Sequence, residues 1–380
     1  MHPFYRGLKL GILGGGQLGR MLIQSAVDFN VHIGILDPSA EAPCKPYAHE
    51  FTQGSLTDYD TVYAFGKNYD VLSIEIENVN TEALEALQAE GKQVYPDPKT
   101  IRMIQNKVKQ KQFYEKHNIP TSAFYTVENK EDVISHAALF PMVQKTAEAG
   151  YDGRGVQILR SEADLDKAFD APGMLEELVD IDKEIAVLAA RNPKGEMAIF
   201  SLVEMVFDPV HNLVDYLLAP ARITESQKEK ALQISRDLLS RLSYVGIMAI
   251  EMFVTKSGEI LVNEVAPRPH NSGHHTIRAC MTSQYEQHLR AILGLPLGNP
   301  EQICPAAMVN MLGAAGHQGP AIYKNIDQIL KIPGVFPHIY GKAMTKPQRK
   351  MGHITILDKN KELLLEKIEM VKGLIDVVSE

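Results

Sequence analysis

The amino-acid sequence predicts an α/β protein, or α+β when the whole chain is counted, and three observations support this class. Residues 8–36 read as a strand, a glycine-rich turn, a helix and a second strand. Two apolar, β-branched runs, 247–254 and 259–266, flank a short turn and predict a β-hairpin. Further strands follow residue 300, separated by a basic loop. A chain of 380 residues is long enough for two or three domains with cores of their own.

The bulk composition disfavours several classes of protein. Lys and Arg number 39 and Asp and Glu number 47, so the formal net charge is 39 − 47 = −8. This acidic balance argues against a general nucleic-acid-binding protein. Three cysteines, widely spaced, favour a reducing compartment over a disulfide framework. We recognise no signal peptide and no apolar run of membrane-spanning length, so we expect a cytoplasmic enzyme that binds neither a membrane nor nucleic acid.

The N-terminal strand leads into a GxGxxG turn formed by Gly14, Gly16 and Gly19, and the next strand ends at Asp37. An acidic residue about 20 positions after the glycines is typical of NAD-binding domains, so a dehydrogenase is one interpretation. A glycine turn that opens a helix also binds other phosphates and anions. The motif alone therefore leaves the ligand open.

The strand predicted at 71–79 carries two carboxylates, Glu75 and Glu77, toward its C-terminal end. Functional groups gather at these strand ends in α/β sheets, although an exposed strand end is the alternative interpretation. Proline-rich residues 95–98 then mark the end of the first domain near residue 100.

A Lys- and Gln-rich helix is predicted at 99–118 and includes Lys107, which could be one solvated lysine among several. A strand at 140–145 ends in Lys145, and the segment 149–156 that follows contains three glycines. Backbone N–H groups of such a loop can wrap a phosphate while the lysine supplies a point charge. No GKS or GKT follows, so this is not a Walker loop, and a plain surface turn is the alternative.

Several further elements follow. Residues 173–179 form a predicted apolar strand, and 184–188 and 196–206 are predicted antiparallel strands of the same unit. An amphipathic helix with an N-cap threonine is predicted at 224–243, and another helix at 276–294.

The predicted hairpin carries the pattern with the most chemical content. If Ser257 and Gly258 form a two-residue turn, counting outward places Glu251 opposite Glu264. Two facing carboxylates within apolar strands repel and are costly to bury, and a bound cation removes that cost. Hard oxygen ligands, completed by substrate phosphates, suit Mg²⁺. Asn263 points the other way and would need a bulge to become a ligand.

Strict alternation puts the two glutamates on an otherwise apolar sheet face, which disfavours the alternative of a plain solvent-facing surface. The apolar residues expected on that face are Ala249, Phe253, Ile260 and Val262. Prolines after residue 266 then force a polar loop that carries Arg268, His270, Asn271 and His274. Arg268 could bind a phosphate or carboxylate through two parallel hydrogen bonds.

The last predicted unit begins near residue 300, with strands at 307–312 and 353–357 and a helix within 359–380. Between the strands lies the densest basic segment of this acidic chain, with Lys342, Arg349 and Lys350. A solvated loop is the alternative to an anion-binding segment.

Three segments resemble the ATP-grasp superfamily and, within it, the N5-carboxyaminoimidazole ribonucleotide synthetase family of purine biosynthesis. They are YDGRG at 151–155, NEVAPRPHNSGHHT at 263–276 and RKMGH at 349–353. The resemblance covers nearly the whole chain. It implies an ATP-grasp fold with a Rossmann-like pre-ATP-grasp domain at 1–100, an ATP-grasp domain at 101–298 with a mobile lid at about 120–185, and a small, β-rich C-terminal domain at 299–380.

The resemblance also implies roles for individual residues. Glu251 and Glu264 would hold Mg²⁺ or Mn²⁺. The residues implied at the ATP site are Lys107, Lys145, Gly150, Gly153, Gly155, Glu176, Glu177, Val179, Glu184, Glu204, Asn263 and Glu264. Catalytic roles are implied for Tyr151, Asp152, Arg154, Arg268, His270, Asn271 and His274. The ribonucleotide would contact Gln17, Asp37, Glu77, Lys342, Arg349 and Lys350. The chain departs from the family's usual residues at Ala149, Met205 and 346–348.

The implied reaction converts ATP, bicarbonate and 5-aminoimidazole ribonucleotide into N5-carboxyaminoimidazole ribonucleotide, ADP and phosphate, in a homodimer. Alternatives are another ATP-grasp ligase, such as a formate-dependent glycinamide ribonucleotide transformylase or a biotin-carboxylase-like enzyme, an NAD-binding dehydrogenase, and a noncatalytic nucleotide sensor. Residues 271–274, Asn-Ser-Gly-His, argue against the other ligases, because the transformylases typically carry Asp-Thr-Gly after the PRPH sequence.

Overall fold

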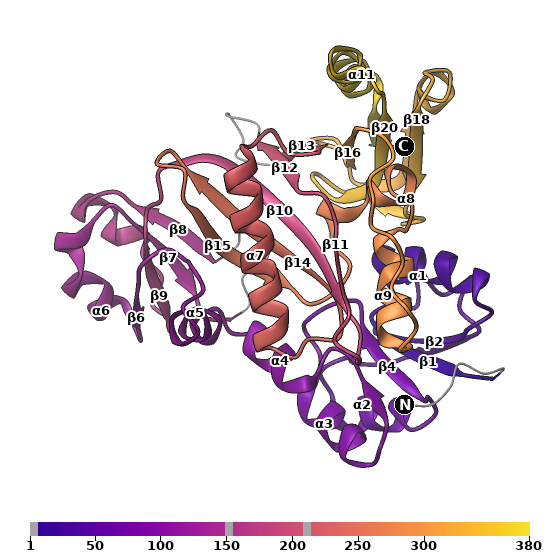
Figure 1. Ribbon diagram of the computed structural model, residues 1–380, viewed down its shortest axis with the longest axis horizontal. Helices are drawn as coiled ribbons and strands as arrows, with labels where there is room; N and C mark the ends of the chain where they lie inside the picture. The colour runs from indigo at the N-terminus through magenta and orange to yellow at the C-terminus, as the bar shows by residue number, and fades with distance from the viewer. Residues whose placement is uncertain (1–6, 149–154, 208–213) are drawn as a thin grey trace.

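The computed structural model describes residues 7–148, 155–207 and 214–380, and their strands form four sheets (Figure 1). The N-terminal unit is a five-stranded parallel sheet in the order β3-β2-β1-β4-β5, with helices between the strands, which confirms the predicted Rossmann-like arrangement. Its strands are β1 (Lys9–Leu13), β2 (His32–Asp37), β3 (Glu50–Gln53), β4 (Val71–Ile74) and β5 (Gln93–Val94). Its helices are α1 (Gln17–Asp28), α2 (Tyr59–Gly66) and α3 (Thr81–Ala89).

A second, antiparallel sheet in the order β6-β9-β7-β8 lies at one end of the molecule (Figure 1). It has a small core of its own, in which Val133, Leu159 and Leu175 are fully buried. Its strands are β6 (Phe124–Val127), β7 (Met142–Thr146), β8 (Val156–Leu159) and β9 (Gly173–Glu177). Its helices are α6 (Lys130–Ser135) and the short 3₁₀ turns Ala137–Leu139 and Glu162–Lys167.

The largest of these sheets runs β15-β14-β10-β12-β13-β16-β20-β18, with β11 paired to β10. The helix α7 (Glu225–Arg241) crosses one face, where its Leu238 and Leu239 pack with Ile250 and Met252 (Figure 1). Thr224 caps this helix through a capping box, which confirms the predicted start. The strands of the central part are β10 (Ile181–Arg191), β11 (Met197–Ile199), β12 (Val203–Phe207), β13 (Val214–Ala219), β14 (Gly246–Thr255) and β15 (Ile260–Ala266).

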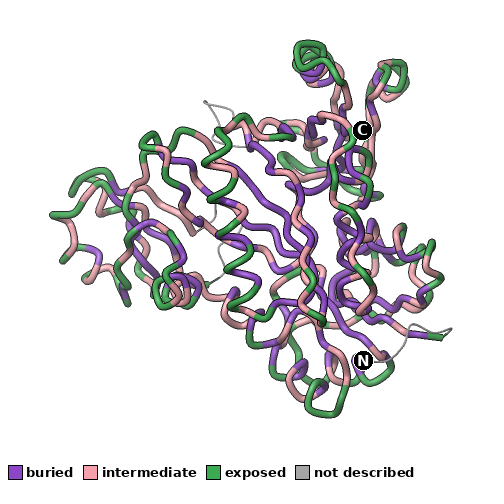
Figure 2. The backbone as a smooth tube through the Cα atoms, viewed as in Figure 1, coloured by how far each residue is buried: buried purple, intermediate pink, exposed green. Residues whose placement is uncertain are grey.

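The C-terminal unit continues this sheet, because β13 pairs with β16. The helix α11 (Lys361–Leu374) buries Leu364, Ile368 and Val371 against it. The remaining strands are β16 (Ala306–Leu312), β17 (Gly319–Lys324), β18 (Val335–Ile339), β19 (Met344–Thr345), β20 (Lys350–Leu357) and β21 (Asp376–Ser379), and α10 spans Ile326–Ile329. Figure 2 shows that burial is continuous along the central strands and sparse at the outer helices.

Two predicted helices are each interrupted. The segment 99–118 forms α4 (Pro98–Ile104) and α5 (Lys107–Lys116), because Asn106 adopts an extended backbone and its side chain accepts a hydrogen bond from Lys109 N–H. The segment 276–294 forms α8 (Thr276–Ala279) and α9 (Gln284–Ile292), separated by the extended Cys280 and a serine cap. The first break matters for the site, because it places Lys107 at the first turn of α5.

No helix among residues 7–148, 155–207 and 214–380 is long and apolar enough to cross a membrane.

Candidate active site

Glu251 and Glu264 face each other across β14 and β15, as the sequence predicts. The strand register shifts between Glu251 and Met252, so that Met252 pairs with Val262 and one residue of β15 has no partner on β14. That extra residue is Asn263, so the strand has a bulge at this position. Strict alternation along the strand required such a bulge for Asn263 to point toward the carboxylates.

The predicted turn of this hairpin is wrong. The N–H of Thr255 donates to the carbonyl of Glu259 at 3.0 Å, so the loop has three residues, 256–258, instead of two. The longer turn and the bulge offset each other at Glu251. In the stretch between the turn and the bulge, the observed pairing differs by one residue from the predicted pairing. Ile260 and Val262 therefore face the core beneath α7 and do not share the face of the glutamates.

The two carboxyl groups differ in acidity. Burial, together with the carboxylates of Glu264 and Glu184, raises the pKa of Glu251 to about 8. Burial opposes ionisation of Glu264 too, but Lys107, Lys145 and His270 hold its pKa below the ordinary value. Facing carboxylates of this kind keep one proton between them, and a bound cation can replace that proton.

The donor atoms at this pair suit a hard divalent cation. They are carboxylate oxygens with a neighbouring amide oxygen, and the Glu264 side chain is 47% exposed, so a ligand can reach it. Nowhere in the described part of the chain do three or more His, Cys, Asp or Glu side chains gather in a way that could hold a metal ion. Oxygens of a substrate would therefore have to complete the coordination shell.

Two lysines flank the carboxylate pair. Lys107 Nζ lies 3.1 Å from Glu264 Oε2, and its backbone N–H donates to Ala147 O. Lys145 Nζ, from β7, lies 3.0 Å from Asn263 Oδ1 and 2.8 Å from Glu176 Oε2. The structure therefore brings together the lysines, the amide and the carboxylates that the sequence placed at one site.

Glu184 and Glu204 lie on opposite faces of the central sheet. Glu184 pairs with Phe253 and shares the face of the glutamate pair, and burial raises its pKa to about 7. Glu204 pairs with Ile185 and points the other way, where Arg222 binds it at 2.6 and 2.9 Å. The structure does not bring Glu204 to the cluster.

The end of β9 carries the remaining residues expected near the nucleotide. Glu176 is 3% exposed, and its carboxylate forms ion pairs with two lysines, Lys145 and Lys111. Glu177 is exposed, with its N–H bound to Ala123 O, and Val179 is half-buried in the loop beyond. Sequence reasoning missed Lys111, since nothing distinguishes it from the other lysines of α5.

β4 ends at Ile74, so Glu75 and Glu77 lie in the turn after the strand and not within it. Glu77 forms an ion pair with Arg268, at 2.9 Å from Nε and 3.0 Å from Nη2. Glu75 Oε1 accepts a hydrogen bond from the N–H of Leu18 in the first turn of α1. Burial raises the pKa of Glu75 to about 7, against the opposing effect of Arg268.

Other residues expected at the ribonucleotide site lie near this turn. Gln17 begins α1, and Asp37 ends β2 with its carboxylate accepting hydrogen bonds from Gly15 N–H at 2.7 Å and Ser39 N–H at 2.8 Å. In the C-terminal unit, Lys342 Nζ donates to Lys350 O, and the half-buried Arg349 donates to Met344 O.

The loop after β15 folds onto α9. His270 Nδ1 lies 3.7 Å from Glu251 Oε1, and within the described residues the buried Asn271 Oδ1 has no hydrogen-bond donor. His274 is 1% exposed, and its Nδ1 accepts from Gln284 and Tyr285. His270 thus lies near Glu251, whereas His274 is buried against Gln284 and Tyr285.

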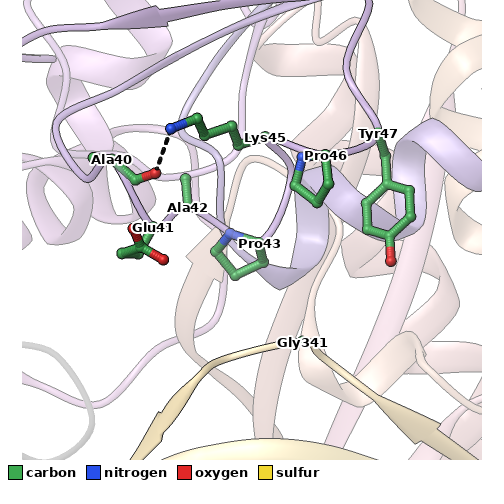
Figure 3. Close-up of a pocket in the computed structure, with 8 residues that line it drawn as sticks. All are labelled: Ala40, Glu41, Ala42, Pro43, Lys45, Pro46, Tyr47 and Gly341. Atoms are coloured by element: carbon green, nitrogen blue, oxygen red, sulfur yellow. Dashed lines mark hydrogen bonds between the residues drawn. The ribbon is translucent and has the colours of Figure 1, made fainter.

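A cavity of about 220 Å³ lies between segment 40–47 of the N-terminal unit and Gly341 of the C-terminal unit (Figure 3). Asp37 and Lys342 lie close to it in sequence, although neither lines it. Its lining residues are Ala40, Glu41, Ala42, Pro43, Lys45, Pro46, Tyr47 and Gly341.

Five predicted site residues lie outside the described residues: Gly150, Tyr151, Asp152, Gly153 and Arg154. Gly155 is described, with a left-handed backbone (φ +71°) and a carbonyl that accepts from Thr146 N–H.

Three family models match consecutive parts of the chain. The ATP-grasp domain matches residues 112–285, the ribonucleotide synthetase preATP-grasp domain matches residues 8–105, and the phosphoribosylaminoimidazole carboxylase C-terminal domain matches residues 306–367. The fold and the site therefore define an ATP-grasp protein.

Individual relatives show which family within the ATP-grasp class the chain resembles. The chain is 33% identical to the N5-carboxyaminoimidazole ribonucleotide synthase of Bacillus subtilis, over 96% of this chain and 95% of that protein. It is 42% identical to the crystal structure of the synthetase from Thermotoga maritima, with a TM-score of 0.91 over 98% of this chain and 100% of that one. The Aspergillus clavatus synthase, solved in complex with ADP and 5-aminoimidazole ribonucleotide, is 32% identical with a TM-score of 0.87, over 96% and 98% of the two chains. The chain belongs to the N5-carboxyaminoimidazole ribonucleotide synthase family.

The chain spans 66% of the length of two other relatives, the phosphoribosylaminoimidazole carboxylases of Vigna aconitifolia and Candida albicans.

Proposed function

We propose that the protein catalyses the ATP- and bicarbonate-dependent carboxylation of 5-aminoimidazole ribonucleotide to N5-carboxyaminoimidazole ribonucleotide, with release of ADP and phosphate. The observation that carries this proposal is the facing pair Glu251 and Glu264, flanked by Lys107, Lys145 and Asn263, in a chain of this family. Two carboxylates with two ammonium groups beside them form a site for a cation and a polyphosphate together.

In this mechanism Lys107 and Lys145 bind the phosphates of ATP, and Glu184, on the same face, binds the ribose hydroxyls. Glu251 and Glu264, with Asn263 beside them, would hold Mg²⁺ or Mn²⁺. When bound, the ion supplies positive charge against the transferring phosphoryl group. Bicarbonate attacks the γ-phosphate, giving carboxyphosphate and ADP. Carboxyphosphate then breaks down to CO₂ and phosphate, and the exocyclic amine of the ribonucleotide captures CO₂ and loses a proton.

His270 lies 3.7 Å from Glu251, and together with Arg268 and Asn271 of the same loop it holds the bicarbonate. Asn271 Oδ1 is buried and accepts no hydrogen bond from the described protein groups, which leaves an unused acceptor in this loop. The backbone amides near Glu176, Glu177 and Val179 receive the adenine. Carboxyphosphate hydrolyses readily, so the site has to close and exclude water while it is present.

For Gly150, Gly153 and Gly155 we infer the role that the family resemblance implies, which is contact with the phosphates of ATP. Tyr151, Asp152 and Arg154 act at the reacting groups. The ribonucleotide binds between the N-terminal and C-terminal units, where its contacts are Gln17, Asp37, Glu77, Lys342, Arg349 and Lys350.

The wider assignments follow from the family. We propose the division 1–100, 101–298 and 299–380, and a homodimer. Because β13 pairs with β16, the parts 101–298 and 299–380 share one sheet, which supports their moving together. We also propose a cytoplasmic location, although one plant relative is named as chloroplastic.

The test measures ADP release from Mg-ATP and bicarbonate, with and without 5-aminoimidazole ribonucleotide. We expect strong stimulation by the ribonucleotide in the wild type, and its loss in Glu264→Gln. Glu259→Gln, an exposed position of the same hairpin, is the matched control and should keep the activity. Turnover with formate and glycinamide ribonucleotide instead would assign the sister ligase, and nucleotide binding without turnover would assign a sensor.

A further inference from the structure

Lys111 is a buried cation for which the proposed mechanism has no role. It lies in the middle of α5 and is 1% exposed, which is rare for a lysine. Its ammonium group lies 2.5 Å from Thr121 Oγ1, 2.8 Å from Ser122 Oγ and 3.1 Å from Ser122 O. It also lies 3.0 Å from Glu176 Oε1. An ammonium has three N–H donors, so these oxygens satisfy it fully.

The Glu176 carboxylate is shared between two ammonium groups. Its Oε1 pairs with Lys111 and its Oε2 pairs with Lys145 at 2.8 Å, while Lys145 also donates to Asn263. Two positive charges and one negative charge leave a net charge of about +1 at this buried cluster. Because Lys111 is also paired with Glu176, the attraction of this carboxylate is divided between two ammonium groups and does not act on Lys145 alone.

The same ammonium is tied to the strand that carries the carboxylate pair. Thr121 Oγ1 accepts from Lys111 and donates to Val262 O at 2.7 Å, and the N–H of Val262 donates to Pro120 O. Val262 is the residue immediately before the bulged Asn263. Lys111 thus contacts the chain where it enters the β6–β9 sheet, at Thr121 and Ser122, and where β9 nears its end, at Glu176.

Burial lowers the pKa of Lys111, and Glu176 opposes that shift. Together Lys111, Glu176, Lys145 and Asn263 form one chain of polar contacts that ends at Asn263, the neighbour of Glu264 in β15. A small cavity lined by Lys107, Lys111, Lys145, Asn263 and Glu264 lies against this chain.

We propose that Lys111 is a positioning residue for ATP binding: by sharing Glu176 it keeps the Lys145 ammonium directed at Asn263 and the phosphates, and it ties that geometry to the chain at Thr121 and Ser122. This inference rests on the proposed use of ATP. Without Lys111, Glu176 has one cationic partner and draws Lys145 away from the phosphates.

The experiment compares Lys111→Met and Lys111→Gln with Lys109→Met, an exposed lysine of the same helix. We expect KM for ATP to rise on the order of tenfold in both Lys111 variants, with a smaller change in kcat and none in KM for the ribonucleotide. Lys109→Met should match the wild type. Lys111→Gln keeps hydrogen bonding to Ser122 and serves as the second variant should Lys111→Met fail to fold.

A second-site variant separates positioning from a merely structural role. In Lys111→Met with Glu176→Gln no carboxylate draws Lys145 away, so KM for ATP should recover most of the way to the wild-type value. A double variant worse than Lys111→Met, or Lys111 variants with the KM of Lys109→Met, would overturn the proposal. A wild-type protein that binds no Mg-ATP would instead refute the proposed function, and this control is run first.

Discussion

Glu75 Oε1 accepts a hydrogen bond from the backbone N–H of Leu18 at 3.1 Å, so a carboxylate of the protein sits in the first turn of α1. A glycine turn that opens a helix commonly receives a phosphate at this place. A Cβ atom on Gly16 would come within 2.5 Å of Glu75 Oε1, and one on Gly14 within 2.9 Å of the Glu75 side chain. The glycines therefore make room for Glu75, which gives this GxGxxG turn a role other than dinucleotide binding.

The wild-type protein should accordingly not bind NAD. The pyrophosphate would have to displace a carboxylate that already accepts the free N–H of the helix, and the two anions would repel. Isothermal titration with NAD, alongside Mg-ATP as the positive control, measures this. NAD binding of micromolar affinity would contradict the assignment of the turn to Glu75.

Glu75 also predicts a pH dependence of stability. Its pKa is raised from 4.5 to about 7, so between these values the folded state binds the proton that the unfolded chain has lost. Its contribution to the free energy of unfolding is complete below pH 4.5 and declines as the pH rises to 7. The decline is at most about 3 kcal/mol, and less because the residue is partly exposed. The free energy of unfolding, measured with urea at pH 5 and 7.5, should decline less in Glu75→Gln than in the wild type. Equal declines in the two proteins would contradict this account.

The bulge at Asn263 gives a third prediction. Asn263→Ala removes the oxygen that Lys145 contacts at 3.0 Å, while the unpaired backbone residue stays in the strand. KM for ATP should rise about tenfold or more, because a charge-assisted hydrogen bond contributes about 1.5–3 kcal/mol and about 1.4 kcal/mol corresponds to a factor of ten. Steady-state kinetics measure it, with Ser257→Ala in the exposed turn as the control. Unchanged KM in Asn263→Ala would show that Lys145 needs no partner on β15.

The sequence predicted the elements whose signal is local. The N-terminal strands and the capped helix α7 follow from apolar periodicity and from Thr224, and both lie where expected. The facing of Glu251 and Glu264 was also predicted, but through a turn one residue too short and without the bulge that compensates for it. Counting along a strand cannot detect a bulge, because the extra residue is accommodated only by tertiary contacts, here those of Asn263 with Lys145.

Long-range polar contacts could not be predicted from the sequence either, because they too depend on the tertiary fold. Lys111 and Glu176 are 65 positions apart, and no periodicity links a lysine in a polar helix to a glutamate in an apolar strand. Glu77 was expected to contact the ribonucleotide, and its pairing with Arg268 across the domain boundary has no local signature. Asn106, by contrast, is a cap residue whose signal was present in the sequence and was read as helix interior.

The Glu77–Arg268 pair leads to the last prediction, which separates two roles of Glu77. Both side chains are about four-fifths buried, at 21% and 18% exposure, so Glu77→Gln leaves Arg268 without its principal counter-charge. If Glu77 positions Arg268, kcat should fall about 10- to 100-fold while KM for ATP stays unchanged, because a small displacement of a reacting group has effects of this size. Glu82→Gln, exposed on α3, should behave as the wild type. Combining Glu77→Gln with Arg268→Lys should then cost little more than either change alone, since both act through one group. Additive losses, with the effect of Glu77→Gln confined to KM for the ribonucleotide, would instead make Glu77 a direct substrate ligand.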